Sequence, residues 1–154
     1  MKRIKITGTK ALKAMTAAMD ERGEEFKFTD MFEDEIGCFY SGIPKDKFEG
    51  YDEDGSPIGE HVPACLVGLA FHLIDPALDE FLSQRDNNAQ AISILFGVDR
   101  HYVSRMADEA FAECDGLEIV VTKKALMVLT AAQECQDGGG TWGEAVERAI
   151  EVVA

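Results

Sequence analysis

Cysteines are few in this sequence, and none is spaced to work with another. The four residues Cys38, Cys65, Cys114 and Cys135 form no Cys-x-x-Cys pair. This spacing excludes the common zinc and dithiol redox motifs and gives no sign of a disulfide framework. All but Cys38 lie in apolar helical patterns. We therefore expect free and mostly buried thiols in the reducing environment of the cytoplasm.

Long hydrophobic runs are also missing. The longest, residues 62–74, is too short to span a bilayer, so membrane insertion is excluded. Residues 2–9 hold only two large apolar side chains, and we expect no secretion leader. The chain has 154 residues, 46% of them hydrophobic, which is enough for a core of its own. A single domain covering residues 1–154 is expected.

Basic residues are in short supply, and those present are unevenly placed. Lys and Arg number 15 against 29 Asp and Glu, which gives a formal net charge of -14. Residues 1–14 carry five bases and no acid, whereas residues 20–60 carry fourteen acids and four bases. A field of this sign repels phosphate backbones and anionic lipids and favours solubility or basic partners. Nucleic acids and membrane surfaces are therefore disfavoured as partners.

Signatures of catalysis and of metal binding are absent or incomplete. There is no Gly-x-Ser-x-Gly, and no histidine stands at motif spacing from a serine or cysteine. His61 and Cys65 have the i, i+4 spacing of two ligands on a helix, but no second pair completes a site. Asp52-Glu-Asp-Gly55 resembles part of a calcium loop without its closing glutamate and predicts a turn. We expect no catalytic residue, no metal, no cofactor and no enzymatic activity.

Apolar residues at helical spacing, together with capping residues, predict a mainly α fold. Two short strands are expected at 26–29 and 38–40, paired as a hairpin, and a third at 117–121. The expected domain is a compact bundle of about six to seven short helices with a small antiparallel β element. The expected helices begin at a Thr9 cap, in the run 62–74 with Pro63 in its first turn, at Asp75-Pro76, near Ala89, at an Asp99 cap with continuation to Cys114, at a Thr122 cap, and at the Thr141–Glu144 capping box.

Residues 41–60 form a long acidic segment that is rich in glycine and proline. Irregular segments of this length inside a compact domain are often functional. Exposed aromatic residues among acids suit binding to a basic protein surface, because the acids attract and orient the partner and the rings supply apolar contact. If the aromatic residues are buried instead, the segment is only a solvated loop over the core. We expect a non-enzymatic protein-binding domain, and the sequence does not decide between a monomer and a homo-oligomer. The candidate partner-binding residues are Phe32, Glu33, Asp34, Phe48, Tyr51, Asp52 and Asp54.

An alternative function comes from residues 90–114, which resemble a helix-turn-helix with Gly97 at the turn. In that interpretation the second helix would present Arg100, His101, Ser104 and Arg105 to a DNA groove. The same segment also carries four acids, and the net charge of -14 opposes phosphate contacts. A plain pair of amphipathic helices joined at a glycine explains the pattern equally well.

Two helical segments share a short pattern, and the turn between the last two helices contains the one tryptophan. Ala11-Leu12 followed by Thr16-Ala-Ala matches Ala125-Leu126 followed by Thr130-Ala-Ala. Common helix formers produce such matches by chance, so no repeat is predicted. Trp142 is expected to pack beside the Thr141 cap, with Gln133 or Asp137 accepting its indole N–H or bonding the backbone of the turn.

The run from Leu129 to Val146, LTAAQECQDGGGTWGEAV, resembles the ending of small uncharacterised proteins of actinobacteria and their phages. Those proteins also tend to carry a Cys-Leu-Val-Gly helix start, matched at residues 65–68, after a short Cys-aromatic strand, matched at 38–40. The resemblance implies a phage or phage-derived origin and the cytoplasm of a bacterial host. With the acidic aromatic segment, this origin leads us to expect a host or phage protein as the partner. The resemblance carries over no functional residues, and the acidic stretch around 41–60 departs from it.

Overall fold

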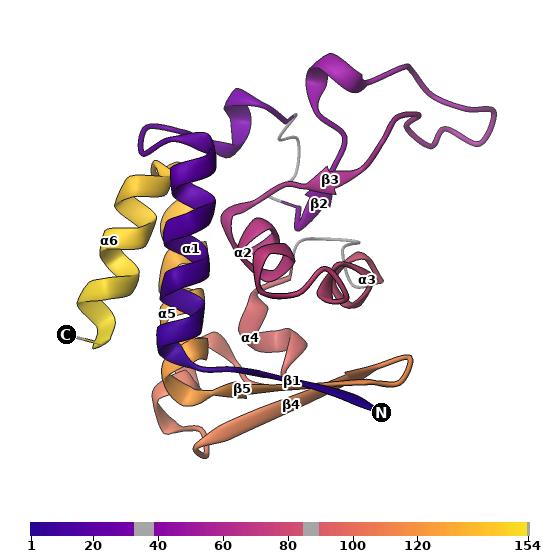
Figure 1. Cartoon of the computed structure of the whole chain (residues 1–154). Coiled ribbons are helices and arrows are strands. Elements are labelled where there is room, and N and C mark those ends of the chain that lie inside the picture. Colours follow the sequence, from indigo (N-terminus) through magenta and orange to yellow (C-terminus); the bar gives the residue numbers. More distant parts are fainter. Residues whose placement is uncertain (33–38, 85–89, 154) are drawn as a thin grey trace.

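The structure, a computed structural model, describes residues 1–32, 39–84 and 90–153 and has a mixed α/β fold (Figure 1). Helices take up 51% of the residues and strands 16%. The strands form a three-stranded sheet of order β1-β5-β4 and a two-stranded sheet of β2 and β3. In chain order the elements are β1 (Lys2–Ile6), α1 (Gly8–Arg22), η1 (Phe28–Asp30), β2 (Ser41–Gly42), η2 (Lys45–Lys47), β3 (Val62–Pro63), α2 (Leu66–Ile74), α3 (Leu78–Ser83), α4 (Ile92–Leu95), η3 (Arg100–Arg105), β4 (Glu109–Cys114), β5 (Leu117–Thr122), α5 (Lys123–Asp137) and α6 (Trp142–Val153), where η marks a 3-10 helix.

The prediction of a mainly α bundle is therefore wrong, and the three-stranded sheet explains the error. β1 pairs with β5 in parallel, and β4 pairs with β5 antiparallel. The sequence predicts a helix from residue 99 to 114, but β4 occupies its second half. Ala110 and Cys114, four residues apart, share one face of a helix and also one face of a strand, so their spacing alone does not separate the two. Pairing with the β-branched strand β5 favours the extended form.

The parallel strands β1 and β5 each lead directly into a long helix. Thr7 caps α1 by accepting the amide of Lys10, and Thr122 caps α5 by accepting the amide of Ala125. Both helices have 15 residues, and they pack against each other. The two segments with the shared Ala-Leu…Thr-Ala-Ala pattern thus hold equivalent places in the fold. The start predicted at a Thr9 cap lies two residues earlier, because β1 fills the preceding segment.

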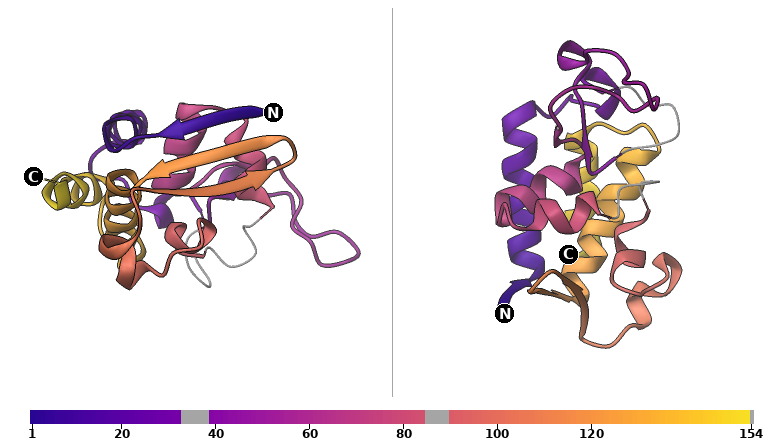
Figure 2. Two further views of the ribbon diagram at one scale, coloured as in Figure 1. Left: turned by 90° about the horizontal axis from the view of Figure 1, so that it is seen from below. Right: turned by 90° about the vertical axis from the view of Figure 1, so that its right-hand side faces the viewer.

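The core lies between the helices and one face of the sheet. Helices α1, α5 and α6 stand side by side above the strands, with α2 against α1 (Figure 1). Buried Ile4, Ile6, Ile119 and Val121 point from the sheet into this core. Among the described residues, no helix lies on the opposite face of the sheet, which faces the viewer in the left view of Figure 2. This face carries the alternating exposed residues of β1 and β4.

The middle of the chain differs from the predicted hairpin. The strand expected at 26–29 is replaced by η1, and the described part of 38–40, residues 39–40, precedes β2 without being a strand; Cys38 lies outside the described residues. Helix α2 begins at Leu66 rather than in the Val62-Pro63 pair, which forms β3. Cys65 caps α2, because its Sγ accepts the Gly68 amide at 3.3 Å.

Several predicted elements are confirmed at or near their expected boundaries. Strand β5 and helix α5 begin where predicted, with Thr122 as the cap. Thr141 and Glu144 form the expected capping box before α6, with Thr141 N donating to Glu144 Oε1 at 3.1 Å and Glu144 N to Thr141 Oγ1 at 3.2 Å. Of the helix expected near Ala89, the described residues contain only the single turn α4. None of the described helices has both the length and the apolar character needed to cross a membrane.

Candidate functional site

Residues 43–60, which we call the arm, project from the body between β2 and β3 (Figure 1). The arm doubles back on itself like a hairpin. Glu49 N donates to Ile58 O at 2.9 Å, Ile58 N to Gly50 O at 2.7 Å, and Asp52 N to Ser56 O at 2.8 Å. These backbone hydrogen bonds hold the arm in one extended shape, although regular structure within it is limited to η2 and an isolated bridge between Tyr51 and Pro57.

The tip of the arm is a turn organised by one carboxylate. Asp52 Oδ1 accepts the amides of Asp54 and Ser56, each at 2.9 Å. Gly55 has a φ of 79°, which side chains with a Cβ rarely adopt. The predicted turn at Asp52–Gly55 is therefore confirmed. Asp52 has a structural role there, whereas the side chains of Glu53 and Asp54 are exposed.

Two aromatic side chains on the arm are open to solvent. Phe48 is 43% exposed and Tyr51 is 67% exposed. Their ring centroids lie 5.2 Å apart at an interplanar angle of 73°, an edge-to-face pair. Exposed large aromatics that form one cluster are a feature of binding surfaces. The structure thus brings together Phe48, Tyr51, Asp52 and Asp54, four of the candidate residues.

The other candidates of the same group are not part of this surface. Phe32 is 2% exposed and stacks on Phe28 with centroids 5.0 Å apart, so its prediction as an exposed anchor is wrong. The physical reason is that the segment after η1 turns Phe32 toward the core beneath the arm. Glu33 and Asp34 lie outside the described residues.

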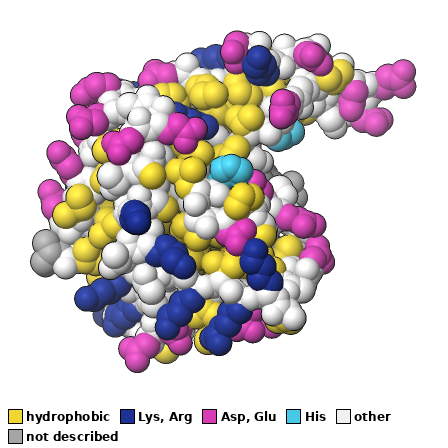
Figure 3. All heavy atoms as spheres, viewed as in Figure 1, with side chains coloured by type: hydrophobic (Ala, Val, Ile, Leu, Met, Phe, Trp, Pro, Cys, Tyr) yellow, Lys and Arg dark blue, Asp and Glu magenta, His cyan; other side chains and the backbone are white. Residues whose placement is uncertain are grey.

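Negative charge dominates the arm. Figure 3 shows Asp and Glu side chains along its outer part, up to the tip. In the part of the chain that the structure describes, no ion pair involves an acid of the arm. Its acids therefore remain available to a partner, apart from the turn bonds of Asp52. They are Asp46, Glu49, Asp52, Glu53, Asp54 and Glu60, against Lys45 and Lys47.

Arg22 connects the base of the arm to the body, and no motif in the sequence marks this residue. Its guanidinium donates to the carbonyl oxygens of Ala64, at 2.5 Å, and Pro63. It also lies over three aromatic rings, with centroid distances of 5.5 Å to Phe26, 5.5 Å to Phe32 and 5.1 Å to Trp142. Burial lowers the pKa of this guanidinium, which is the expected effect of removing a cation from water.

A second tie at the base comes from Lys45. Its amide donates to Met31 O at 2.9 Å, and its Nζ donates to Thr29 O at 2.8 Å. Together with Arg22, these contacts fix where the arm leaves the body. A partner would therefore meet a positioned surface rather than a random segment.

The amide side chains of α5 connect separate parts of the chain. Gln136 Oε1 accepts the Leu66 amide at 2.8 Å, and Gln133 Oε1 accepts the Ile92 amide at 2.7 Å. Gln133 Nε2 also donates to Tyr40 Oη at 3.0 Å. The prediction that Gln133 or Asp137 accepts the Trp142 indole N–H is wrong, since this buried N–H has no hydrogen-bond partner among the described residues. Gln133 instead links α5 to Tyr40 and to the start of α4.

The predicted helix-turn-helix is also wrong. Its first helix is the four-residue α4, and its second is the six-residue 3-10 helix η3, after which the chain enters β4. Asp99 does cap η3, accepting the His101 amide at 2.8 Å. The candidate DNA-contacting residues Arg100, His101, Ser104 and Arg105 are exposed, but they lie on no recognition helix.

The histidines and cavities do not form a deep site. Cavities of about 380 Å³ and 180 Å³ lie beside α3, and Asp79 and Glu80 line both. His72 Nδ1 lies 2.7 Å from Asp79 Oδ2, and these side chains are 37% and 45% exposed, which makes them a surface pair. Cys65, which stands at i, i+4 spacing from His61, is used as the α2 cap. Within the described ranges, no group of three or more His, Cys, Asp or Glu side chains is placed to hold a metal ion.

The chain was compared with protein-family models, with curated proteins and with solved structures. None of them matches it. The resemblance to actinobacterial and phage proteins therefore stays a prediction, and the function is inferred from the surface of the molecule alone.

Proposed function

We propose that this protein is a non-enzymatic binding domain that docks its acidic arm on a basic surface of another protein. The observation that carries the proposal is the exposed Phe48–Tyr51 pair on a projecting hairpin, among acids that form no ion pair within the described residues. The aromatic rings supply apolar contact, and the acids supply orientation and attraction.

The physical gain comes mainly from the two rings. Fully burying a side chain of this size is worth about 1.5–3 kcal/mol relative to leaving it in water. The acids around them raise the association rate with a positively charged partner more than they raise affinity. Because the backbone bonds of the arm already exist in the free protein, docking loses less conformational entropy than ordering a free loop would.

The proposed setting is the cytoplasm of a bacterial host, with a host or phage protein as the partner. The resemblance of the C-terminal run supports this setting, and the low cysteine content with no disulfide pattern agrees with a reducing compartment. The partner surface is expected to be rich in Lys and Arg around an apolar patch, as complementarity to the arm requires.

Site-specific cross-linking tests the proposal. A photo-reactive amino acid replaces Tyr51 in one variant and Ile150 in a control, since Ile150 is 50% exposed on α6, away from the arm. After irradiation in an actinobacterial lysate, the variant with the probe at position 51 should yield a discrete cross-linked protein that the control lacks. Equal products from both positions, or none from position 51, would refute docking through the arm.

A further inference from the structure

Basic residues gather at the end of the molecule opposite the arm. We call Lys5, Lys10, Lys13, Lys123 and Lys124 the basic corner. They lie near the end of β1, in the first two turns of α1 and in the first turn of α5. Figure 3 shows Lys and Arg side chains concentrated along the lower part of the molecule, whereas acids dominate the projecting arm. The chain thus has two charged ends of opposite sign.

Three lysines of the basic corner, Lys10, Lys123 and Lys124, occupy positions where acids are usually favoured. The first turn of a helix carries partial positive charge and prefers Asp or Glu. Neither α1 nor α5 has an acid in its first turn, although the chain contains 29 acids. The two helix starts are adjacent, because a Cβ added to Gly8 would lie 2.9 Å from Lys124 Cβ. Lysines there oppose helix stability, which is the kind of local conflict expected at a functional surface.

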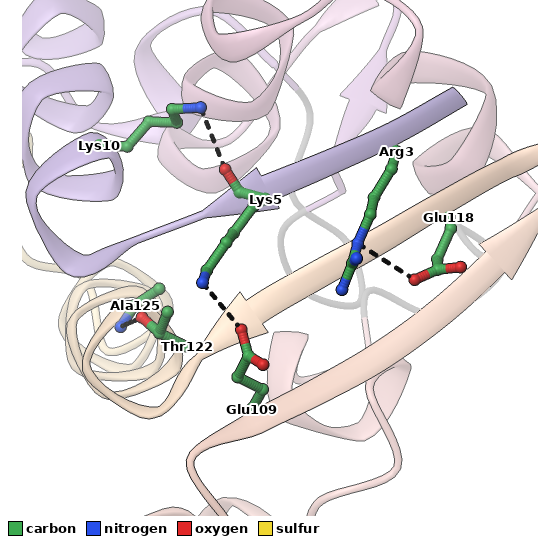
Figure 4. Close-up of polar contacts among 7 residues, drawn as sticks. All are labelled: Arg3, Lys5, Lys10, Glu109, Glu118, Thr122 and Ala125. Atoms are coloured by element: carbon green, nitrogen blue, oxygen red, sulfur yellow. Dashed lines mark hydrogen bonds and ion pairs between the residues drawn. The ribbon is translucent and has the colours of Figure 1, made fainter. Parts of the chain in front are cut away.

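Part of the positive charge on this end is paired and part is free (Figure 4). Lys5 Nζ lies 3.1 Å from Glu109 Oε2, and Arg3 Nε lies 3.3 Å from Glu118 Oε1. Lys10 Nζ donates to the Lys5 carbonyl at 3.0 Å. In the described part of the chain, Lys13, Lys123 and Lys124 have no acid within ion-pair distance. At least three ammonium groups therefore remain for an anionic partner.

One exposed aromatic ring, that of Phe111, adjoins the basic corner on the open face of the sheet, which also carries Glu109, Glu113 and Glu118. Lys5, Val120 and Phe111 are direct cross-strand neighbours on β1, β5 and β4. Phe111 is 55% exposed, and Val120 is buried although it does not belong to the main core cluster. No described helix covers this face (Figure 2). The surface combines unpaired cations with one exposed aromatic ring.

We propose that the basic corner and the adjoining sheet face bind the acidic arm of a second copy of this chain. The charges are complementary, with Lys13, Lys123 and Lys124 facing the arm's acids. The arm's Phe48–Tyr51 pair has a matching exposed ring in Phe111. Acids attracted to the corner would also meet two helix starts of favourable sign. The inference rests on the proposed docking role of the arm and adds one specific partner.

The geometry makes this contact intermolecular. The arm and the three-stranded sheet lie at opposite ends of the molecule (Figure 1), so an arm cannot reach the corner of its own chain. Each copy would offer one arm and one corner. Two copies that exchange arms reciprocally form a closed twofold dimer, whereas copies that do not close in this way build a ring or an open chain.

Charge reversal and mixing test the inference by analytical ultracentrifugation of the full chain. The wild type should associate in about 50 mM salt and return toward monomer in about 0.5 M salt, where screening is stronger. Glu53→Lys with Asp54→Lys in the arm, or Lys13→Glu with Lys124→Glu in the corner, should each weaken association at least about tenfold. Glu147→Lys with Glu151→Lys on α6 makes the same charge change as the arm variant and should leave association intact.

Two further samples distinguish a specific interface from general charge effects. An equimolar mixture of the arm variant and the corner variant should associate where neither variant does alone, because the wild-type arm meets the wild-type corner and the reversed arm meets the reversed corner. Combining all four reversals in one chain should restore association. The α6 variant also controls for misfolding as the cause of weaker association. The corner variant is expected to fold, because an acid at position 124 suits a helix start.

Defined results would overturn the inference. A wild-type chain that stays monomeric in low salt overturns self-association, and the proposed function survives if Tyr51 still cross-links a different protein. Association that the arm and corner reversals leave unchanged also overturns it, as does a corner that binds duplex DNA while the chain stays monomeric. If the chain associates as expected but position 51 cross-links only a second copy, the proposed foreign partner fails instead.

Discussion

Arg22 connects the arm to the helical core through contacts that no local sequence pattern predicts. It is the last residue of α1, yet it bonds two carbonyl groups at the end of β3 and packs among rings from three separate segments. Because its cation is largely withdrawn from water, its hydrogen bonds matter more than those of a surface arginine. The position of the arm therefore depends on this side chain together with the contacts of Lys45.

Replacing Arg22 by Met should lower the free energy of unfolding by about 2–4 kcal/mol, since two buried carbonyl groups lose a charged donor. Lys at this position should restore little, because an ammonium does not reproduce the planar donor pair. Urea denaturation measures the change, with Arg148→Met on the exposed face of α6 as the control, expected within about 0.5 kcal/mol of wild type. Equal effects at the two positions would remove Arg22 from this role.

The capping box of α6 predicts a pH dependence. Hydrogen bonds from the Thr141 backbone and hydroxyl lower the pKa of Glu144 below its usual 4.5. The carboxylate therefore stabilises the folded state above the unfolded pKa, and this contribution is lost as pH falls through the lowered folded value. The melting temperature of wild type should exceed that of Glu144→Gln near neutral pH, and the gap should narrow as pH falls below the usual carboxyl pKa of 4.5. A gap that stays constant from neutral to acid pH would contradict the assignment.

Single-residue chemistry identifies the composition of the candidate site but not the burial of each member. Phe32 and Phe48 both stand among acids in the sequence, so the pattern treats them alike. The structure buries one beneath Arg22 and exposes the other beside Tyr51. That difference depends on contacts with distant segments, which a single sequence does not contain.

At the scale of elements, the sequence correctly predicts the helices and the strand whose boundaries are marked by capping residues. Strand β5, helix α5 and helix α6 are found where expected, because Thr122 and the Thr141–Glu144 box mark their starts independently of the fold. Strands β1 and β4 are missed, because each is short, rich in charge and stabilised only by pairing with β5. Tertiary pairing overrides local preference there.

Helix α2 meets residues 39–40 so closely that only glycine fits between them. A Cβ at Gly68 would lie 2.1 Å from the Tyr40 carbonyl oxygen, an impossible distance for a fixed backbone group. Gly68→Ala should therefore destabilise the protein by about 1–3 kcal/mol in thermal or urea unfolding. Gly42→Ala is the matched control, because its Cβ would meet the nearest atom of Phe32 at 3.4 Å, an ordinary contact. A tolerated alanine at Gly68 would mean that α2 and this segment can separate freely.

At the scale of the whole molecule, charge is separated along the chain and in space. The sequence already places bases in residues 1–14 and acids in residues 20–60. The fold carries these segments to opposite ends, the first onto the sheet and the adjoining helix starts and the second onto the arm (Figures 1 and 3). Composition predicts an acidic protein with a basic partner. It does not predict that the same molecule presents a basic surface as well, because β1 and the two adjacent helix starts emerge only from the sheet pairing.

The central claim is that the arm, rather than the acidity of the whole chain, recognises a partner. The most direct measurement is quantitative capture from an actinobacterial lysate with immobilised wild type, the arm variant Glu53→Lys with Asp54→Lys, and the α6 variant Glu147→Lys with Glu151→Lys. The two variants change the net charge equally, and all four positions are exposed. The arm variant should lose at least about nine-tenths of the captured partner while the α6 variant retains it. Equal retention or equal loss by the two variants would contradict the claim.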